Sequence, residues 1–259
     1  MPDRIEALID DLSSADESVR RHALEDLGDL GDARAVAPLA EALAEPSAAI
    51  REAAVDALKA IRGEATICAV APKLRSPVTA VRNAASEILQ AIGEPAVPCL
   101  LRLLEDDDKD IRKYAVDILT QIGSPAAEAA FIRVLSDRDV NVASAAAEAL
   151  GRVGGPDSVP SLIRLLRTNS WVQCSVAKSL GQLGGAEALA ALRRLTQDDD
   201  PMVVFSAVDA LIHAGCDEAF DALLPFREHP NRLIRKRVAA AFEARLAASA
   251  NQANQTTNV

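Results

Sequence analysis

The sequence predicts an all-α protein built as a solenoid of paired helices, and three observations support this fold class. A β-branched residue recurs every 30 or 31 residues along the chain of 259 residues. Residue types that begin and end helices recur at fixed distances from it. Alanine and leucine dominate and aromatic residues make up only 3%, which favours thin, closely packed helices. A period of this length is typical of helical repeat proteins.

The recurring β-branched residue is predicted to lie near the start of the first helix of each repeat, and it serves here as a phase marker. Four and eight residues after each marker come a small and then a large apolar residue, as in Ala54 and Leu58 after Ile50. This spacing places all three on one helical face. The markers are Val19, Ile50, Val81, Ile111, Val142, Val172, Val203 and Ile234.

Each first helix also has a predicted start and end. Three residues before the markers stand residues that, except for Val78, can cap a helix start: Asp16, Ser47, Val78, Asp108, Asp139, Asn169, Asp200 and Asn231. Twelve residues after the marker a glycine is expected to end the helix in a left-handed conformation. These glycines are Gly31, Gly93, Gly123, Gly154, Gly184 and Gly215, with Gly63 one place late. A second, leucine-rich helix follows.

The pattern predicts one solenoid over residues 1–248, made of sixteen helices. It opens with a half repeat at 1–13 and closes with a single charged helix at 231–248, as a terminal cap requires. The tail 249–259 is rich in Asn, Gln and Thr and is predicted to be disordered. The seven full repeats are expected at about 16–45, 46–75, 76–106, 107–136, 137–167, 168–197 and 198–229.

Two segments of the sequence resemble the short HEAT repeats of the phycobilisome lyase type. One runs from Val19-Arg20 through Leu27-Gly28-Asp29-Leu30-Gly31 to Pro38-Leu39, and the other from Leu150-Gly151-Arg152 to Leu162. The resemblance covers roughly residues 1–248. It implies a right-handed α/α superhelix with first helices outside and second helices on the concave side, where such proteins usually hold partners.

The resemblance brings enzymatic relatives into consideration. Deoxyhypusine hydroxylase holds iron with His-Glu dipeptides, but His22, His213 and His229 are followed by Ala, Ala and Pro, which excludes that chemistry. HEAT-like DNA glycosylases use a basic concave face, which the acidity of this chain disfavours. The bilin lyases act as paired subunits without a sharp catalytic motif, so a lyase-like subunit remains an alternative.

Composition and charge narrow the function further. The net charge of −10 disfavours nucleic-acid binding, which needs a basic surface. No apolar run is long enough to span a membrane and no leader is evident, so we predict a cytoplasmic protein. The four cysteines show no C-x-x-C spacing and are expected to be reduced. No catalytic residues, metal ligands or cofactor site are predicted.

A row of arginines is the first candidate site. Arg102, Arg133, Arg164 and Arg194 stand at equivalent places in four consecutive second helices, between core positions and pointing outward. With helices about 8–10 Å apart, they would form a basic stripe about 30 Å long on the concave face. Guanidinium groups suit carboxylates or phosphates, so the expected partner is an acidic or phosphorylated protein segment. The alternative is that each arginine pairs with an acid of a neighbouring repeat and only solubilises the face.

An apolar patch is the second and weaker candidate. Large residues replace small or polar ones just before the markers at Trp171, Met202 and Leu233, and Phe205 joins them. In repeats five to seven the arginine that follows the marker elsewhere, as at Arg20, is replaced by Ala143, Gln173 and Val204. Exposed large side chains would indicate a binding patch. The alternative is that they pack between successive repeats.

The functional prediction is a non-catalytic scaffold that presents its concave surface to another protein, in bacterial signalling or complex assembly. The alternative is an accessory subunit of a bilin-lyase-like or other enzyme complex, active only with a partner chain. The pattern predicts neither the identity of the partner nor an oligomeric state, because repeat proteins diverge on the surfaces that bind.

Overall fold

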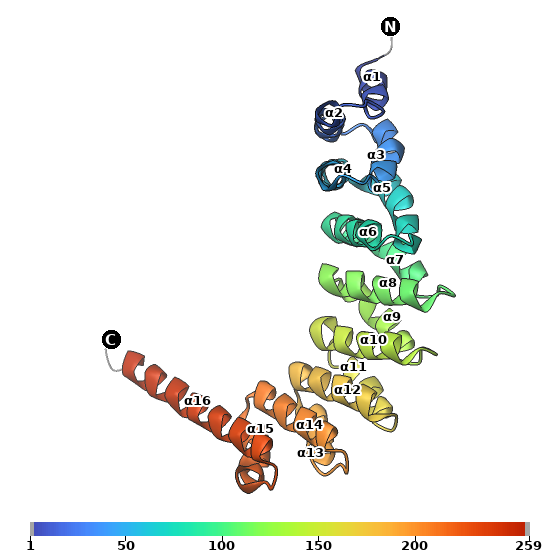
Figure 1. Cartoon of the computed structure of the whole chain (residues 1–259). Coiled ribbons are helices and arrows are strands. Elements are labelled where there is room, and N and C mark those ends of the chain that lie inside the picture. Colours follow the sequence, from blue (N-terminus) through green and yellow to red (C-terminus); the bar gives the residue numbers. More distant parts are fainter. Residues whose placement is uncertain (1–2, 257–259) are drawn as a thin grey trace. The chain divides into compact units, whose positions relative to one another are not determined.

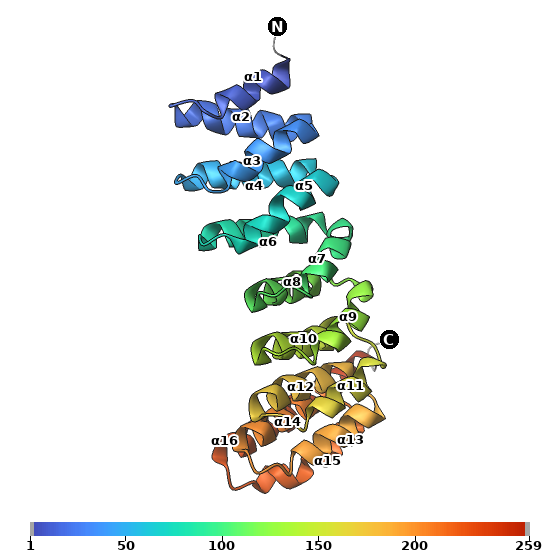
Figure 2. The same cartoon turned by 90° about the vertical axis from the view of Figure 1, so that its right-hand side faces the viewer.

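The computed structural model describes residues 3–256 of the chain, and the side chains of residues 3–248. The described residues form sixteen α-helices and no strand, which confirms the predicted all-α solenoid. The chain divides into two compact units, Met1–Ala127 and Glu128–Val259, so the division falls between the two helices of the predicted repeat 107–136. Within each unit, first helices stack on first helices and second helices form a separate layer (Figures 1 and 2).

The two helices of a repeat differ in length. The first helices span 14 residues each, before the longer closing helix: α2 (Glu17–Leu30), α4 (Ala48–Ile61), α6 (Thr79–Ile92), α8 (Lys109–Ile122), α10 (Val140–Val153), α12 (Ser170–Leu183), α14 (Pro201–Ala214) and the closing α16 (Arg232–Thr256). The second helices are shorter: α1 (Arg4–Asp11), α3 (Val36–Ala42), α5 (Gly63–Val70), α7 (Val97–Leu103), α9 (Glu128–Val134), α11 (Ser158–Leu165), α13 (Ala186–Leu195) and α15 (Asp217–Leu223). Five short 3₁₀ turns adjoin second helices, at Ala33–Ala35, Ala71–Arg75, Glu94–Ala96, Pro125–Ala127 and Leu224–Glu228.

The closing helix α16 continues past its predicted end at residue 248 and reaches Thr256. The sequence between these points contains neither glycine nor proline, so nothing interrupts the backbone hydrogen bonds of the helix. Residues 257–259 of the predicted disordered tail lie outside the described residues.

Most first helices begin at the predicted capping residue. The side-chain oxygen of Asp16, for example, accepts a hydrogen bond from the backbone N–H of Ser18 at 2.8 Å. The prediction was wrong at Ser47, whose hydroxyl donates instead to Glu17 Oε1 at 2.7 Å and so joins two repeats. The confirmed caps are Asp16, Asp108, Asp139, Asn169, Asp200 and Asn231.

Most of the closing glycines have the expected positive φ, but Gly154 does not. Gly31 has φ +66° and Gly123 has φ +74°, both in the left-handed region. Gly154 has φ −77° and ψ 162°, an extended conformation open to any residue. A Cβ there would lie 2.5 Å from the carbonyl oxygen of Leu150 and 2.7 Å from Ser158 Oγ. Glycine is therefore needed at position 154 for space and not for its backbone angle.

The predicted apolar face of the first helices forms the core. Ile50, Ala54 and Leu58 are buried, as are the equivalent residues of most other repeats. The exceptions are Phe242 of the closing helix, which is partly exposed, and the first marker, Val19, which is 38% exposed. Among the described residues only the second helix α1 precedes α2, and no first helix covers Val19. Burial of the marker thus depends on a complete preceding repeat.

Three glycines inside first helices allow unusually close packing. A Cβ at Gly28 would lie 2.8 Å from the Cα of Ala57, and one at Gly181 would lie 2.9 Å from the Cα of Ala210. A Cβ at Gly151 would lie 2.8 Å from the Cα of Ser179. Correspondingly, α2 on α4, α10 on α12 and α12 on α14 are the most extensively packed helix pairs within the units. These glycines set the local spacing of the stack.

The arginine after the marker closes the loop that precedes its helix. Arg51 Nη1 donates to the carbonyl oxygens of Glu45 and Pro46, both at 2.7 Å, and Arg112 Nη1 donates to those of Asp106 at 2.8 Å and Asp107 at 3.1 Å. Arg20 and Arg235 make the same bonds to the carbonyl oxygens five and six residues earlier. Arg82 bonds only the carbonyl oxygen six residues earlier. Each of these arginines thus clamps the loop before its own helix. We call Arg20, Arg51, Arg82, Arg112 and Arg235 the loop-clamp arginines.

Candidate functional site

The four arginines of the predicted stripe are exposed on second helices, but they belong to two units. Arg102 lies on α7 in the first unit. Arg133 lies on α9, Arg164 on α11 and Arg194 on α13, all in the second unit. Within that unit α9 packs against α11 and α11 against α13. We call Arg133, Arg164 and Arg194 the arginine row.

The arginine row has no acidic partner among the described residues. Arg133 Nη1 donates to the carbonyl oxygen of Ala129 in its own helix, at a long 3.4 Å. Arg164 Nη2 donates to Ser161 Oγ, also in its own helix, at 2.8 Å. No ion pair of the described residues includes either side chain, or that of Arg102 or Arg194. The guanidinium groups are therefore available to an external anion.

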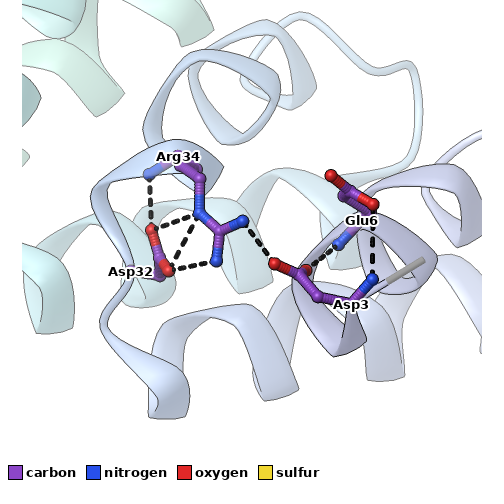
Figure 3. Close-up of polar contacts among 4 residues, drawn as sticks. All are labelled: Asp3, Glu6, Asp32 and Arg34. Carbon is purple, nitrogen blue, oxygen red and sulfur yellow. Dashed lines mark hydrogen bonds and ion pairs between the residues drawn. The ribbon is translucent and has the colours of Figure 1, made fainter. Parts of the chain in front are cut away.

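Several basic side chains of the first unit do pair with acids, as Arg34 illustrates (Figure 3). Its guanidinium bonds Asp3 at 2.5 Å and Asp32 at 2.8 Å, so it joins the half repeat to the first full repeat. The hydrogen bond from Arg34 is the main reason that the pKa of Asp3 and the pKa of Asp32 lie below the ordinary value. Asp3 also caps α1 in a reciprocal pair with Glu6.

Two further pairs of the first unit cross between repeats. Arg75 bonds the carboxylate of Asp106, which lowers the pKa of Asp106, and Lys73 Nζ lies 2.9 Å from Glu41 Oε1. This is the solubilising arrangement expected as the alternative for the stripe. It occurs at these residues and not at the arginine row.

The apolar patch contains a groove between α12 and α14 in the second unit. Trp171 is 63% exposed, Met202 64% and Phe205 39%. These three side chains line a cavity of about 650 Å³ together with Cys174 and His213. We call this cavity the apolar groove. Leu233, on α16, is also exposed but does not line it.

The exposure of Trp171 and Met202 follows from their position in the repeat. The residue before the marker is exposed in every repeat, as at Ser18, Ala49 and Asp110. Large side chains placed there extend into solvent instead of packing between repeats. The charged residues that line the groove are in ion pairs. Lys178 Nζ lies 2.9 Å from Glu148 Oε2, and Asp209 Oδ1 lies 2.6 Å from Arg237 Nε.

Sequence reasoning missed a second cavity, which joins the end of the arginine row. It has a volume of about 760 Å³ and is lined by Arg193, Arg194, Leu189, Cys216 and Glu218, among others. Arg193 Nη2 donates to the carbonyl oxygen of Glu218 at 2.6 Å, so it is anchored while its neighbour Arg194 is not. The sequence held one indication of this site, the Arg193-Arg194 dipeptide. Adjacent residues of a helix point in different directions, so only one of the two arginines could belong to the row and the other had to face a neighbouring element.

No helix in the described part of the chain is both long enough and apolar enough to cross a membrane. No curated protein matches the sequence.

Several solved structures are similar to the chain. An engineered protein is 24% identical, covering 93% of this chain and 78% of its own, with a TM-score of 0.47. The complex of CpcE and CpcF of phycocyanin lyase from Nostoc sp. PCC7120 is 22% identical, covering 86% and 93%, with a TM-score of 0.40. Human deoxyhypusine hydroxylase in complex with glycerol is 20% identical, covering 92% and 94%, with a TM-score of 0.39.

The family comparison covers nearly the whole solenoid. The model of a family described as HEAT repeats matches residues 5–89, 97–174 and 167–243. The matched ranges extend from the half repeat into the closing helix, so they include the arginine row and the apolar groove.

Proposed function

The chain belongs to the HEAT repeat family, and from this premise we propose that it is a non-catalytic cytoplasmic scaffold that binds a protein partner through an acidic or phosphorylated segment. The observation that carries the proposal is the arginine row: three exposed guanidinium groups on adjacent helices, none of them in an ion pair among the described residues. On a chain with a net charge of −10, such a row is a local basic surface. It attracts anionic groups of a partner.

The chemistry of the row favours carboxylate or phosphate groups. A guanidinium group presents a planar fork of donors that can bind either anion through two parallel hydrogen bonds. Arg133 and Arg164 now make only contacts within their own helices. A partner therefore has no ion pair to displace before it binds, which lowers the cost of association.

A charge reversal tests the proposal. We expect the double substitution Arg133→Glu/Arg164→Glu to weaken partner binding at least about tenfold per arginine, which corresponds to about 1.4 kcal/mol each. The partner is captured from the native host on immobilised protein, identified, purified and titrated by isothermal calorimetry.

The matched control is Arg152→Glu/Lys236→Glu. It makes the same change in net charge at exposed residues of the first helix α10 and of α16, and it should leave the affinity unchanged. Circular dichroism establishes that both variants fold. Equal affinity of the wild type and the charge-reversed variant would refute the arginine row as the binding surface.

A second candidate function is that of an accessory subunit in a lyase-like or other enzyme complex. The apolar groove favours it, because its volume of about 650 Å³ lies within the range of small-molecule sites. Trp171 and Phe205 offer faces on which a flat conjugated molecule can stack. The same groove can instead hold an apolar side chain of a protein partner, with Trp171 as the anchor.

Trp171 is the only tryptophan of the chain, so its fluorescence reports on the groove alone. If the groove holds a conjugated small molecule, titration with a bilin should quench Trp171 emission saturably, and Met202→Glu should weaken the binding at least about tenfold. Met202 is 64% exposed, so this substitution should not disturb folding. Linear quenching that is the same in both proteins would show collision in solution and remove the small-molecule candidate.

A further inference from the structure

Resting on the proposed function, we infer that the arginine row binds an extended segment of the partner with an acidic residue at every third position. The inference specifies the conformation and the spacing of the acidic segment. Neither follows from the charge of the row alone.

The spacing of the row comes from the repeat itself. Arg133, Arg164 and Arg194 occupy equivalent places on α9, α11 and α13, and these helices pack one against the next. Neighbouring helix axes lie about 8–10 Å apart. The three guanidinium groups therefore recur at about that interval along the layer of second helices.

A polyproline-type segment matches this interval. It rises about 3.1 Å per residue with three residues per turn, so every third side chain points the same way and advances about 9 Å. A β-strand cannot present such a series, because residues three apart face opposite sides. An α-helix could do so only with acids seven residues apart, which advance about 10.5 Å.

The surface beside the arginines favours the extended segment over a helix. One helical turn before each arginine lies a small exposed residue: Ala129 before Arg133, Pro160 before Arg164 and Ala190 before Arg194. Side chains on a helix lean toward its N-terminus, so these residues form a smooth strip along the row. A docked amphipathic helix would need a groove for large apolar anchors along the whole row, whereas the cavity beside Ala190 and Arg194 lies only at its end.

Carboxylates on the same helices do not compete for the row. The single acid of α9 is Glu128, whose Oε1 accepts hydrogen bonds from the N–H of Gly155 at 2.7 Å and from Ser158 Oγ at 2.6 Å. Helix α11 contains no acidic residue. In α13 the one acid is Glu187, in the first turn, whereas Arg194 stands in the last. The acidic groups that complete the row must come from the partner.

Three peptides of identical composition test the spacing. The first carries three Glu residues at positions 1, 4 and 7 of a proline-rich segment, the second carries them at 1, 3 and 5, and the third carries them consecutively. Binding to the full chain is measured by fluorescence anisotropy at fixed salt. We expect the first peptide to bind at least about tenfold more tightly than the other two.

A central variant and a matched control locate the effect. Arg164→Gln should weaken binding of the first peptide at least about tenfold and abolish its advantage over the others, whereas Arg152→Gln should do neither. A longer helical peptide with Glu at every seventh position should bind no better than the consecutive one.

The outcomes separate this inference from the proposed function. If all three peptides bind equally and Arg164→Gln weakens each of them, the every-third spacing is overturned while the arginine row stands as an anion-binding surface. Preference for the helical peptide would overturn both the extended conformation and the every-third spacing, while the arginine row stands as the binding surface. If no peptide binds, the inference fails, and capture of the native partner by wild type but not by Arg133→Glu/Arg164→Glu still decides the proposed function.

Discussion

Substitution of Gly181 by leucine should lower the free energy of unfolding by about 2–4 kcal/mol. The Cβ of any side chain at this position would lie 2.7 Å from the carbonyl oxygen and 2.9 Å from the Cα of Ala210. These atoms belong to the backbone of α14, so relief requires α12 and α14 to move apart. That movement would open the packing along both helices.

The control uses the same leucine at a place where the helices leave room. Gln90 stands at the equivalent position of α6 and is exposed, so Gln90→Leu should change the free energy of unfolding by no more than about 0.5 kcal/mol. Urea titrations followed by circular dichroism give the comparison. If Gly181→Leu behaves like Gln90→Leu, the glycine does not set the spacing of α12 and α14.

Replacement of Arg112 by methionine should cost about 2–4 kcal/mol of stability. Arg112 is only 4% exposed and is the most deeply buried of the loop-clamp arginines. Methionine preserves much of the apolar stem but leaves the carbonyl oxygens of Asp106 and Asp107 without the donor they now have. Both hydrogen bonds are partly buried, and backbone acceptors that lose their donor in such a place are costly.

Two further variants show whether the hydrogen bonds are responsible. Arg112→Lys keeps a donor and should recover part of the lost stability. Arg152→Met makes the original substitution at an exposed arginine of α10 and should have an effect within about 0.5 kcal/mol. Equal urea midpoints for Arg112→Met and Arg152→Met would disprove the clamp as a stabilising feature.

The repeat and most of its boundaries could be predicted from the sequence because each depends on local chemistry. An aspartate such as Asp16 caps the helix that begins one residue later, and a glycine such as Gly31 ends the helix before it. The prediction failed at Ser47 and Gly154, where contacts with other residues decide the conformation: Ser47 bonds Glu17 of the previous repeat, and the space at Gly154 is limited by Leu150 and Ser158.

The close helix spacing at Gly28, Gly151 and Gly181 was not recognised in the sequence, although its signal is present. In each case the residue opposite in the next repeat is also small, namely Ala57, Ser179 and Ala210. In the less extensively packed pair α4 and α6, the equivalent residues are Lys59 and Ile88. Comparison of positions across consecutive repeats, and not within one, reveals the pattern.

For the candidate sites, the sequence indicated which side chains would be exposed but not whether they would be paired. Arg133 and Arg75 both belong to second-helix segments, yet Arg75 bonds Asp106 and Arg133 bonds no carboxylate of the described residues. Pairing depends on the reach of two side chains across a repeat boundary, which residue types and spacing leave open. The function of the arginine row and of the apolar groove stays a prediction.

The loop-clamp arginines bear on how such an array can grow by duplication. Each clamp joins a donor to acceptors five and six residues earlier, so a copied stretch of about thirty residues inherits both ends of the interaction wherever it is inserted. The glycine contacts join different repeats, and a new copy meets a neighbour that did not evolve beside it. Newly duplicated repeats therefore begin with intact loops and mismatched helix spacing, and later substitutions adjust the boundary between them.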